Sequence, residues 1–260
     1  MTASSPADND LGARLAEIVE EAARLILPLW KSGLEVSAKA DESPVTEADR
    51  RGETLILMRL AEVFPDTPVV SEEYASIFGC PETICSPFFL VDPLDGTKAF
   101  VRGDPNFTVN IGLIDAGRPI AGAVCAPATG ETWFTGAGGA FKRRAGEPLS
   151  QVSARPWADA EAIALISHTM KPEAQALLMA EFGVARTLPM DSSIKLCRIA
   201  EGEADVYPRR GPTMEWDIAA GHAVLLAAGG RLTTPDGEPF VYGKADEGFR
   251  NGPFIARGAA

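Results

Sequence analysis

The sequence predicts a layered α+β fold, because the spacing of its apolar residues changes twice along the chain. Helical spacing dominates the first quarter, strand-like alternation with short turns follows, and the last part alternates between strands and helices. Helices and sheets that carry one apolar face must bury it against another element, which produces stacked layers. We expect the functional site at the junction between the antiparallel half and the alternating half.

The N-terminal region should form two amphipathic helices joined by a polar loop. Apolar residues recur at helical spacing over residues 11–29, and the polar segment 39–45 follows as a loop. Thr46 suits the N-cap of a second helix, which should run to Pro65. Asp49 lies three residues after Thr46, so the two side chains could form a capping box.

The later elements follow from the same criteria. Short strands are expected at 68–71 and 88–92, an antiparallel meander at 107–114, 120–126, 131–134 and 140–143, and a connection at 150–159. Further strands are expected at 162–166, 184–188 and 204–207, and helices at 172–182, 193–201 and 216–228. The glycine-rich segment 136–139 should be a hairpin turn, because it lacks GxGxxG spacing. We therefore divide the chain into a flexible tail (1–10), an N-terminal α+β half (11–150) and a C-terminal α/β half (151–260).

The composition argues against several classes of function. A net charge of −12 leaves no excess of Lys and Arg for binding a nucleic acid polymer. No apolar stretch approaches the roughly 20 residues of a membrane-spanning helix, and the polar N-terminus does not resemble a secretory signal, so we expect a cytoplasmic protein. The four cysteines show no paired spacing and there are only two histidines, so a zinc site is not expected. Any chemistry should come from carboxylates, hydroxyls and a bound metal.

The most informative segment reads VDPLDGT, residues 91–97. Asp92 and Asp95 follow an apolar stretch, so both carboxylates should leave the end of a buried strand. Two carboxylates this close repel each other unless a cation lies between them, and Mg²⁺ prefers such oxygen ligands. The residues after Thr97 could begin a helix whose free N–H groups would face an anion beside the metal. A simple Asx turn would also explain a bare Asp-x-x-Asp, but the pattern is that of a metal-dependent phosphate site.

Four further segments supply polar groups that suit such a site. They are Thr46-Glu-Ala-Asp49, Ser71-Glu72-Glu73, Arg209-Arg210 and Glu215-Trp-Asp217. Acidic residues at helix starts are usually caps, and paired arginines are usually solvated, so each segment alone indicates little. Their meaning depends on whether the fold brings them together.

Taken together, these segments resemble the inositol monophosphatase superfamily, whose members are Mg²⁺-dependent, lithium-inhibitable phosphomonoesterases. Its paired signature corresponds to residues 92–97 and 216–221, and the resemblance extends from about Leu11 to Arg257. The finer matches are to the CysQ-type 3'(2'),5'-bisphosphate nucleotidases, at 39–49, 71–73, 95–98, 107–110, 192–195 and 207–212. The resemblance implies an α-β-α-β-α sandwich of the inositol monophosphatase / sugar phosphatase type. Asp191 departs from it, because a Gly is common at that place.

The resemblance also implies roles for individual residues. Two Mg²⁺ ions, or as many as three, would be held by Glu72, Asp92, Asp95, Asp217 and the backbone carbonyl of Leu94. The catalytic set would be Thr97, Asp49 and Glu72, with Thr97 paired to Asp49 and activating the attacking water. The substrate-binding set would be Glu72, Leu94, Asp95, Gly96, Thr97, Lys98, Ser192, Ser193, Lys195, Arg209, Arg210 and Asp217.

The implied reaction is hydrolysis of 3'-phosphoadenosine 5'-phosphate to AMP and phosphate, a step in sulfur assimilation. Arg209 and Arg210 could meet the second phosphate, because a guanidinium group offers two parallel donors to phosphate oxygens. Inositol monophosphate, histidinol phosphate and fructose 1,6-bisphosphate remain alternative substrates, and a catalytically silent binding protein remains an alternative class. The resemblance further implies a homodimer and peripheral association with the inner membrane, which the acidic composition does not favour.

Overall fold

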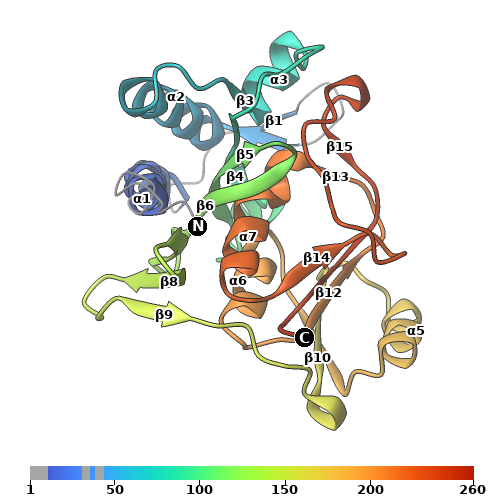
Figure 1. The fold of residues 1–260 in the computed structure, drawn as a ribbon. Coiled ribbons are helices and arrows are strands. Elements are labelled where there is room, and N and C mark those ends of the chain that lie inside the picture. Colours follow the sequence, from blue (N-terminus) through green and yellow to red (C-terminus); the bar gives the residue numbers. More distant parts are fainter. Residues whose placement is uncertain (1–10, 31–35, 39–43) are drawn as a thin grey trace.

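The computed structural model describes residues 11–30, 36–38 and 44–260 (Figure 1). Its α-helices are α1 (Leu11–Trp30), α2 (Glu47–Val63), α3 (Glu72–Phe78), α4 (Thr97–Arg102), α5 (Pro172–Phe182), α6 (Ile194–Ala200) and α7 (Glu215–Ala227). Its strands are β1 (Val36–Ala38), β2 (Pro44–Thr46), β3 (Val69–Ser71), β4 (Phe88–Asp95), β5 (Thr108–Asp115), β6 (Arg118–Ala126), β7 (Glu131–Gly136), β8 (Gly139–Arg144), β9 (Ser150–Val152), β10 (Ile163–Ile166), β11 (Arg186–Pro189), β12 (Val206–Arg209), β13 (Thr213–Met214), β14 (Arg231–Thr233), β15 (Arg250–Asn251) and β16 (Phe254–Arg257).

The larger sheet has seven strands in the order β3-β4-β5-β6-β7-β8-β9. Strands β3 and β4 are parallel, and every later pair in this sheet is antiparallel. The order from β5 to β8 follows the chain, which confirms the predicted meander, and Gly136 pairs with Gly139 across the predicted hairpin turn. Parallel pairing of β3 with β4 aligns Ser71 with Val91, so that Glu72, just after β3, and Asp92, within β4, come to the same edge.

The second sheet has five strands in the order β11-β10-β12-β16-β14. Strand β10 runs parallel to both of its neighbours, whereas β16 runs antiparallel to β12 and β14. Two smaller pairs, β1 with β2 and β13 with β15, lie apart from these sheets. The β13–β15 pair is the one that matters for the site, because Thr213 and Met214 immediately precede α7.

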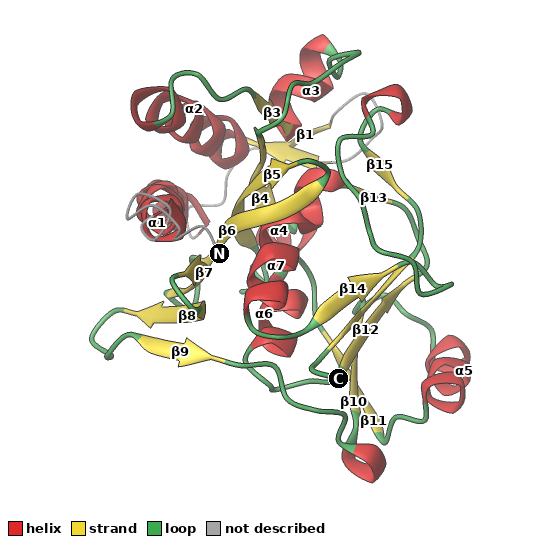
Figure 2. Ribbon diagram, in the orientation of Figure 1, coloured by secondary structure: helices red, strands yellow, loops and turns green. Residues whose placement is uncertain are grey.

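The two sheets and the helices form five layers, as Figures 1 and 2 show. Helices α1 and α2 cover one face of the larger sheet, α6 and α7 lie between the two sheets, and α5 lies on the outer side of the second sheet. The predicted α+β sandwich of alternating helical and sheet layers is therefore confirmed. In the part of the chain that the structure describes, no helix is both long and apolar enough to cross a membrane.

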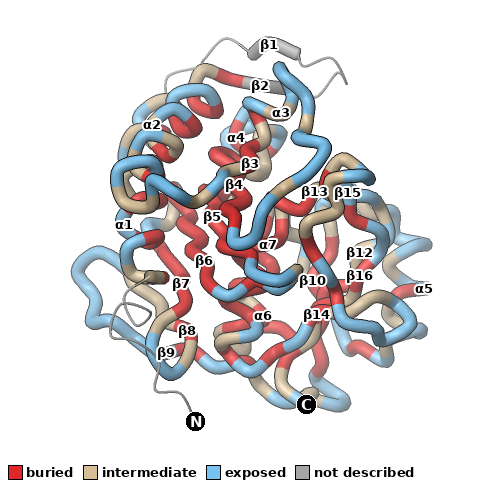
Figure 3. Tube along the Cα trace, turned by 45° about the horizontal axis from the view of Figure 1, so that its top comes forward, coloured by how far each residue is buried: buried red, intermediate tan, exposed pale blue. Residues whose placement is uncertain are grey.

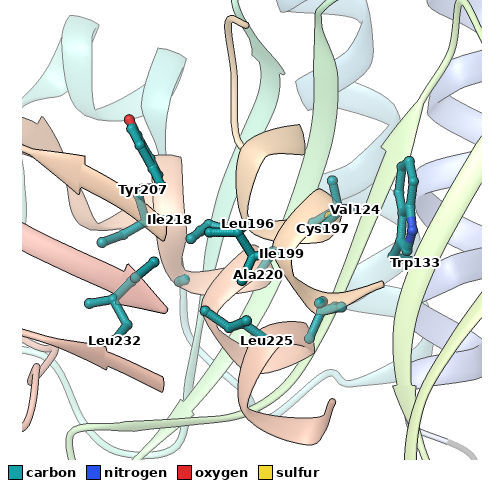
Figure 4. Close-up of a cluster of buried hydrophobic side chains, with 14 of the residues drawn as sticks. Val124, Trp133, Leu196, Cys197, Ile199, Tyr207, Ile218, Ala220, Leu225 and Leu232 are labelled. Carbon is teal, nitrogen blue, oxygen red and sulfur yellow. The ribbon is translucent and has the colours of Figure 1, made fainter. Parts of the chain in front are cut away.

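The core lies on both faces of the larger sheet, so that its central strands and α7 are almost entirely buried (Figure 3). The close-up in Figure 4 shows the apolar layer between the sheets. Leu196, Cys197 and Ile199 of α6 lie between Val124 and Trp133 on one side and residues of the second sheet, such as Leu232, on the other. This cluster joins residues from both halves of the chain into one core.

Helix α7 approaches the larger sheet closely because two strand positions are glycines. A Cβ atom at Gly122 of β6 would lie 2.6 Å from the carbonyl oxygen of Ala220, and one at Gly112 of β5 would lie 2.9 Å from the Cβ atom of Ala219. Small residues on both surfaces therefore set the distance between helix and sheet.

Gly122→Val is expected to lower the free energy of unfolding by about 2–3 kcal/mol, because overpacking has to push α7 away from the sheet. Urea unfolding measures this loss. Gly252→Ala is the control, since a Cβ at Gly252 would meet nothing within 4 Å. Equal stability of the Gly122→Val protein and the wild type would show that α7 has room to move.

Several predicted elements differ in their bounds, and some were not predicted. The second helix begins after Thr46 with a complete capping box, as expected, but it ends at Val63. Pro44 and Val45 were predicted to lie in a loop, but they belong to strand β2, because they pair with β1. Residues 39–43 of the predicted loop and the predicted tail 1–10 lie outside the described residues. The proposed boundary at 150/151 falls inside β9, the last strand of the larger sheet.

Candidate active site

A cavity of ≈ 560 Å³ opens where α3, β4, α4, α6, β12 and α7 meet. It is lined by twelve of the residues predicted from the sequence: Glu72, Asp92, Leu94, Asp95, Gly96, Thr97, Lys98, Ser192, Ser193, Lys195, Arg209 and Asp217. These residues come from segments more than 100 positions apart in the sequence. The fold therefore brings both signature segments to one site.

Strand β4 delivers two of the carboxylates through an irregularity in its pairing with β5. Asp92 pairs with Asn110 and Asp95 pairs with Thr108, so two residues on β4 oppose one on β5. Such a bulge bends the strand and redirects its side chains. The Asp92 carboxylate then accepts a hydrogen bond from the Leu94 N–H (3.0 Å), which fixes its orientation.

Backbone N–H groups orient two of the carboxylates, those of Asp95 and Asp217. Asp95 Oδ2 accepts from the Ser193 N–H at 2.5 Å, and Asp217 Oδ2 accepts from the Met214 N–H at 2.8 Å in a capping arrangement at the start of α7. A hydrogen-bonded backbone amide orients a carboxylate without neutralising it. Each of these two carboxylates carries a second oxygen that could serve another ligand.

The carboxylates destabilise each other's charge. Burial raises the pKa of Asp92 well above its usual range, and the negative charges of Glu72, Asp95 and Asp217 raise it further. The pKa of Asp217 is raised well above normal, first by burial and then by Asp95 and Glu72. Burial also raises the pKa of Asp95 to about 6, although the nearby Lys195 ammonium opposes the shift. A proton or a cation has to balance this cluster at neutral pH.

The donor set suits a hard divalent cation. It consists of carboxylate oxygens and the Leu94 carbonyl, which are the ligands that Mg²⁺ and Ca²⁺ prefer. Within the described residues, no group of three or more acidic, imidazole or thiol side chains already forms a finished metal site. The carboxylates would therefore have to rotate toward a bound ion, whose positive charge would offset their mutual repulsion.

Thr97 and Asp49 are held together at the edge of the site. The Thr97 hydroxyl lies 3.2 Å from Asp49 Oδ1 and 3.1 Å from the Leu94 carbonyl oxygen. Asp49 Oδ2 accepts from the backbone N–H of Thr46 (2.7 Å) and from its hydroxyl (2.6 Å), and only 2% of Asp49 is exposed. Asp49 is not part of the cavity wall, so it can act there only through Thr97.

The two serines and Lys195 form one wall of the cavity. Ser193 Oγ lies 2.8 Å from Asn110 Oδ1 and 2.9 Å from the Thr108 hydroxyl. Lys195 Nζ donates to the carbonyl oxygen of Ser192 at 2.6 Å. Burial lowers the pKa of Lys195 to about 8. Ser192 has a positive φ of 56°, and the Lys195 contact helps to hold this unusual backbone.

The structure separates the two arginines. Arg209, at the end of β12, lines the cavity, and its guanidinium donates to the Gly211 and Pro212 carbonyl oxygens. The Arg210 side chain is 72% exposed, pairs with Glu181 of α5 and does not line the cavity. Successive side chains of an extended chain point to opposite sides, which explains the difference. The predicted contact of Arg210 with a second phosphate therefore has no support in this arrangement.

Sequence reasoning missed residues at the cavity mouth. His168, which follows β10, lines the cavity and its Nδ1 lies 2.6 Å from Asp191 Oδ1. Arg102 Nη2 donates to the other oxygen of Asp191 at 2.9 Å. Asp191 is therefore held by two partners. The position of His168 directly after a parallel strand was the signal that could have pointed to it.

Glu53 is a second missed residue. It is 8% exposed, and its Oε1 accepts from the N–H groups of Glu73 (2.9 Å) and Tyr74 (3.3 Å). Burial raises the pKa of Glu53. Glu53 thus caps α3, the helix whose first residue is Glu72. Because Glu53 lies twenty positions before Glu73 in the sequence, no local sequence pattern indicates this role.

Comparisons with known proteins identify the family of this chain. The family model described as "Inositol monophosphatase family" matches residues 5–256. The 3'(2'),5'-bisphosphate nucleotidase CysQ of Shigella flexneri is 41% identical over 211 residues, which cover 80% of this chain and 83% of that protein. The protein of that name from Buchnera aphidicola is 34% identical over 250 residues, covering 94% and 92%.

A solved structure is similar over almost the whole chain. The structure of CysQ from Bacteroides thetaiotaomicron, described as a bacterial member of the inositol monophosphatase family, superposes with a TM-score of 0.78. It is 32% identical, and the match covers 97% of this chain and 98% of that one. The fold, the gathered signature residues and these matches lead to one conclusion: this chain belongs to the inositol monophosphatase family.

Proposed function

We propose that this protein is a Mg²⁺-dependent phosphomonoesterase that hydrolyses 3'-phosphoadenosine 5'-phosphate to AMP and phosphate, a 3'(2'),5'-bisphosphate nucleotidase. The observation that carries the proposal is the set of buried and half-buried, mutually repelling carboxylates facing a cavity that also contains Arg209. The relatives named 3'(2'),5'-bisphosphate nucleotidase, at 34–41% identity, support the choice of substrate.

The residues that would hold the ions are Glu72, Asp92, Asp95, Asp217 and the Leu94 carbonyl. Bound Mg²⁺ would lower the pKa of a water molecule and offset the negative charge of the phosphate. The raised pKa values of Asp92 and Asp217 fit this role, because a cation would replace the proton that burial and repulsion otherwise favour. The number of ions, expected to be two or as many as three, stays a prediction.

Thr97 would handle the proton of the attacking water. Its hydroxyl oxygen could accept that proton while its own proton moves to Asp49 Oδ1, 3.2 Å away. Asp49 in turn is kept in place by the two hydrogen bonds from Thr46. The pair thus links the water to a buried carboxylate that does not itself reach the cavity.

The rest of the cavity would bind the nucleotide. A volume of ≈ 560 Å³ lies within the range of small-molecule sites, which is roughly 300–1,000 Å³. Arg209 would receive the second phosphate, and Lys98, Ser192 and Ser193 also line the cavity. Lys195 would contribute mainly by holding the Ser192 backbone, given its hydrogen bond to that carbonyl.

The decisive measurement is phosphate release with Mg²⁺ from 3'-phosphoadenosine 5'-phosphate, inositol 1-phosphate, histidinol phosphate and fructose 1,6-bisphosphate in parallel. We expect a preference of ~100-fold or more for the nucleotide, which corresponds to about 2.7 kcal/mol of differential transition-state binding. A preference for another substrate would keep the metal chemistry and overturn the substrate. No turnover of any of the four would contradict an enzymatic function.

Arg209→Ala is expected to raise KM for the bisphosphate substrate by ~10- to 100-fold, because one charged phosphate contact is lost. A smaller rise in KM for a substrate with a single phosphate would identify the second phosphate as the group that Arg209 binds. Arg210→Ala is the matched control, since it removes a guanidinium one residue away that pairs with Glu181. Equal effects of the two substitutions would contradict the separate roles assigned to them.

The cytoplasmic location expected from the sequence, and the homodimer and peripheral association with the inner membrane implied by the resemblance, stay predictions. Cell fractionation and size-exclusion chromatography would test these predictions.

A further inference from the structure

A ring of hydrogen bonds, formed by side chains that do not line the cavity, holds the start of α7. Glu215, the first residue of α7, is completely buried, and its Oε1 accepts from Lys244 Nζ at 2.6 Å. The same ammonium donates to Asn251 Oδ1 at 3.2 Å. Asn251 Nδ2 donates to the Met214 carbonyl oxygen (2.8 Å), and the Met214 N–H donates to Asp217 (2.8 Å). Through Met214, the ring is therefore connected to Asp217, a residue of the candidate metal site.

The ring is built from buried and half-buried groups that depend on one another. Asn251 is 3% exposed, and Glu215 also accepts from the backbone N–H groups of Gly243 (2.8 Å) and Lys244 (3.0 Å). Lys244 Nζ lies 5.2 Å from the centre of the Phe240 ring. Removal of one partner of a buried ion pair leaves the other charge without compensation, so the arrangement is sensitive to every member.

The ring reaches the site through the backbone of Met214. This residue lies in β13, which pairs with β15, and Asn251 lies in β15. The Asn251 amide also donates to the Thr213 hydroxyl at 3.2 Å, and Thr213 lines the cavity. A shift of the β13 backbone would therefore turn both the N–H that orients the Asp217 carboxylate and part of the cavity wall.

We propose that Lys244, Glu215 and Asn251 are positioning residues, which act through Met214 to hold the Asp217 carboxylate toward the metal site. The inference rests on the proposed function, in which Asp217 is a metal ligand. None of the three side chains lines the cavity. Groups that orient metal ligands from outside typically change metal affinity by ~10- to 100-fold when they are replaced.

A purely structural role predicts a loss of stability and no change in metal affinity, and the chain offers a matched control for it. Lys142 is also an ion-paired lysine with a 19% exposed side chain, the same exposed fraction as Lys244. It pairs with Glu131 and Glu201, and its Nζ lies 5.0 Å from the centre of the Trp133 ring. Lys142 is absent from the cavity wall and from the ring that holds α7.

The experiment compares Lys244→Met with Lys142→Met in the full-length protein. Metal-stripped protein is titrated with Mn²⁺ without substrate, and free Mn²⁺ is followed by electron paramagnetic resonance; Mn²⁺ prefers the same oxygen ligands as Mg²⁺. Thermal unfolding of both variants is recorded in parallel. We expect both to unfold at lower temperature, whereas only Lys244→Met weakens at least one Mn²⁺ binding step by ~10-fold or more.

Two further variants keep the test decisive if Lys244→Met does not fold. Asn251→Ser removes the donor to Met214 but leaves Lys244 paired with Glu215, and it should weaken the same Mn²⁺ step. Lys244→Arg keeps a positive charge near Glu215 and should recover most of the affinity. Wild-type affinity in Asn251→Ser, or equal weakening in the two methionine variants, would overturn the positioning role. A wild-type protein that binds no Mn²⁺ would instead overturn the proposed function.

Discussion

Asp95→Asn is expected to reduce phosphate release by ~10³-fold or more, a loss of about 4 kcal/mol of transition-state stabilisation, while the protein stays folded. The amide keeps the shape of the side chain, and its oxygen can still accept the hydrogen bond from the Ser193 N–H. It no longer supplies the negative charge that a divalent ion requires. Steady-state kinetics and circular dichroism together measure the two parts of this expectation.

Asp115→Asn serves as the control for that substitution. Asp115 ends β5 at an exposed turn, where its Oδ1 accepts a hydrogen bond from the Ser86 hydroxyl. We expect nearly unchanged turnover, because the residue lies outside the cavity wall. Full activity of Asp95→Asn would remove Asp95 from the metal site, whatever the role of its neighbours.

Without metal, Asp95→Asn is expected to be more stable than the wild type at pH 7.5. The pKa of Asp95 is raised to about 6 in the folded protein, first by burial, and its unfolded value is near the ordinary pKa of about 3.9. The folded state then binds more protons than the unfolded state, so the contribution of Asp95 to stability is fully present below pH ~4. It is lost as the pH rises through about 6. The advantage of the variant should therefore shrink toward pH 4.5.

Urea unfolding with EDTA at pH 4.5 and 7.5 tests whether the stability advantage of Asp95→Asn shrinks as the pH falls. Burial lowers the pKa of His222 to about 3, and this neutral imidazole destabilises the fold as the pH falls. Both proteins contain His222, so its contribution cancels in the difference between them. Addition of Mg²⁺ at pH 7.5 should reverse the order, because the ion stabilises the wild type more than the variant. A variant that is less stable than the metal-free wild type at pH 7.5 would contradict the electrostatic account.

The sequence predicted those parts of the fold that local patterns control. The capping box of Thr46 and Asp49, the helix at 172–182 and the meander after Thr108 all follow from neighbouring residues. The signature around Asp92 and Asp95 also gave the carboxylates of the site, because an apolar strand that ends in acidic residues directs them to one sheet edge. Local chemistry was enough for these elements.

The features that were missed depend on contacts between distant segments. Glu53 caps α3 from α2, and Lys244 reaches Glu215 across 29 positions, so neither leaves a periodic pattern. The contrast between Arg209 and Arg210 depends on which side of β12 faces the cavity, which the sequence does not state. Asp191 departs from the family pattern, and the structure engages its charge with Arg102 and His168.

The placement of α7 between the two sheets has a consequence for dissecting the protein. This helix belongs to the C-terminal half, yet Ala219 and Ala220 cover glycines of the larger sheet. A fragment ending at residue 150 would expose that apolar face to water and would lack Asp217. The chain should therefore unfold as one cooperative unit, and neither half should be recoverable as a soluble piece.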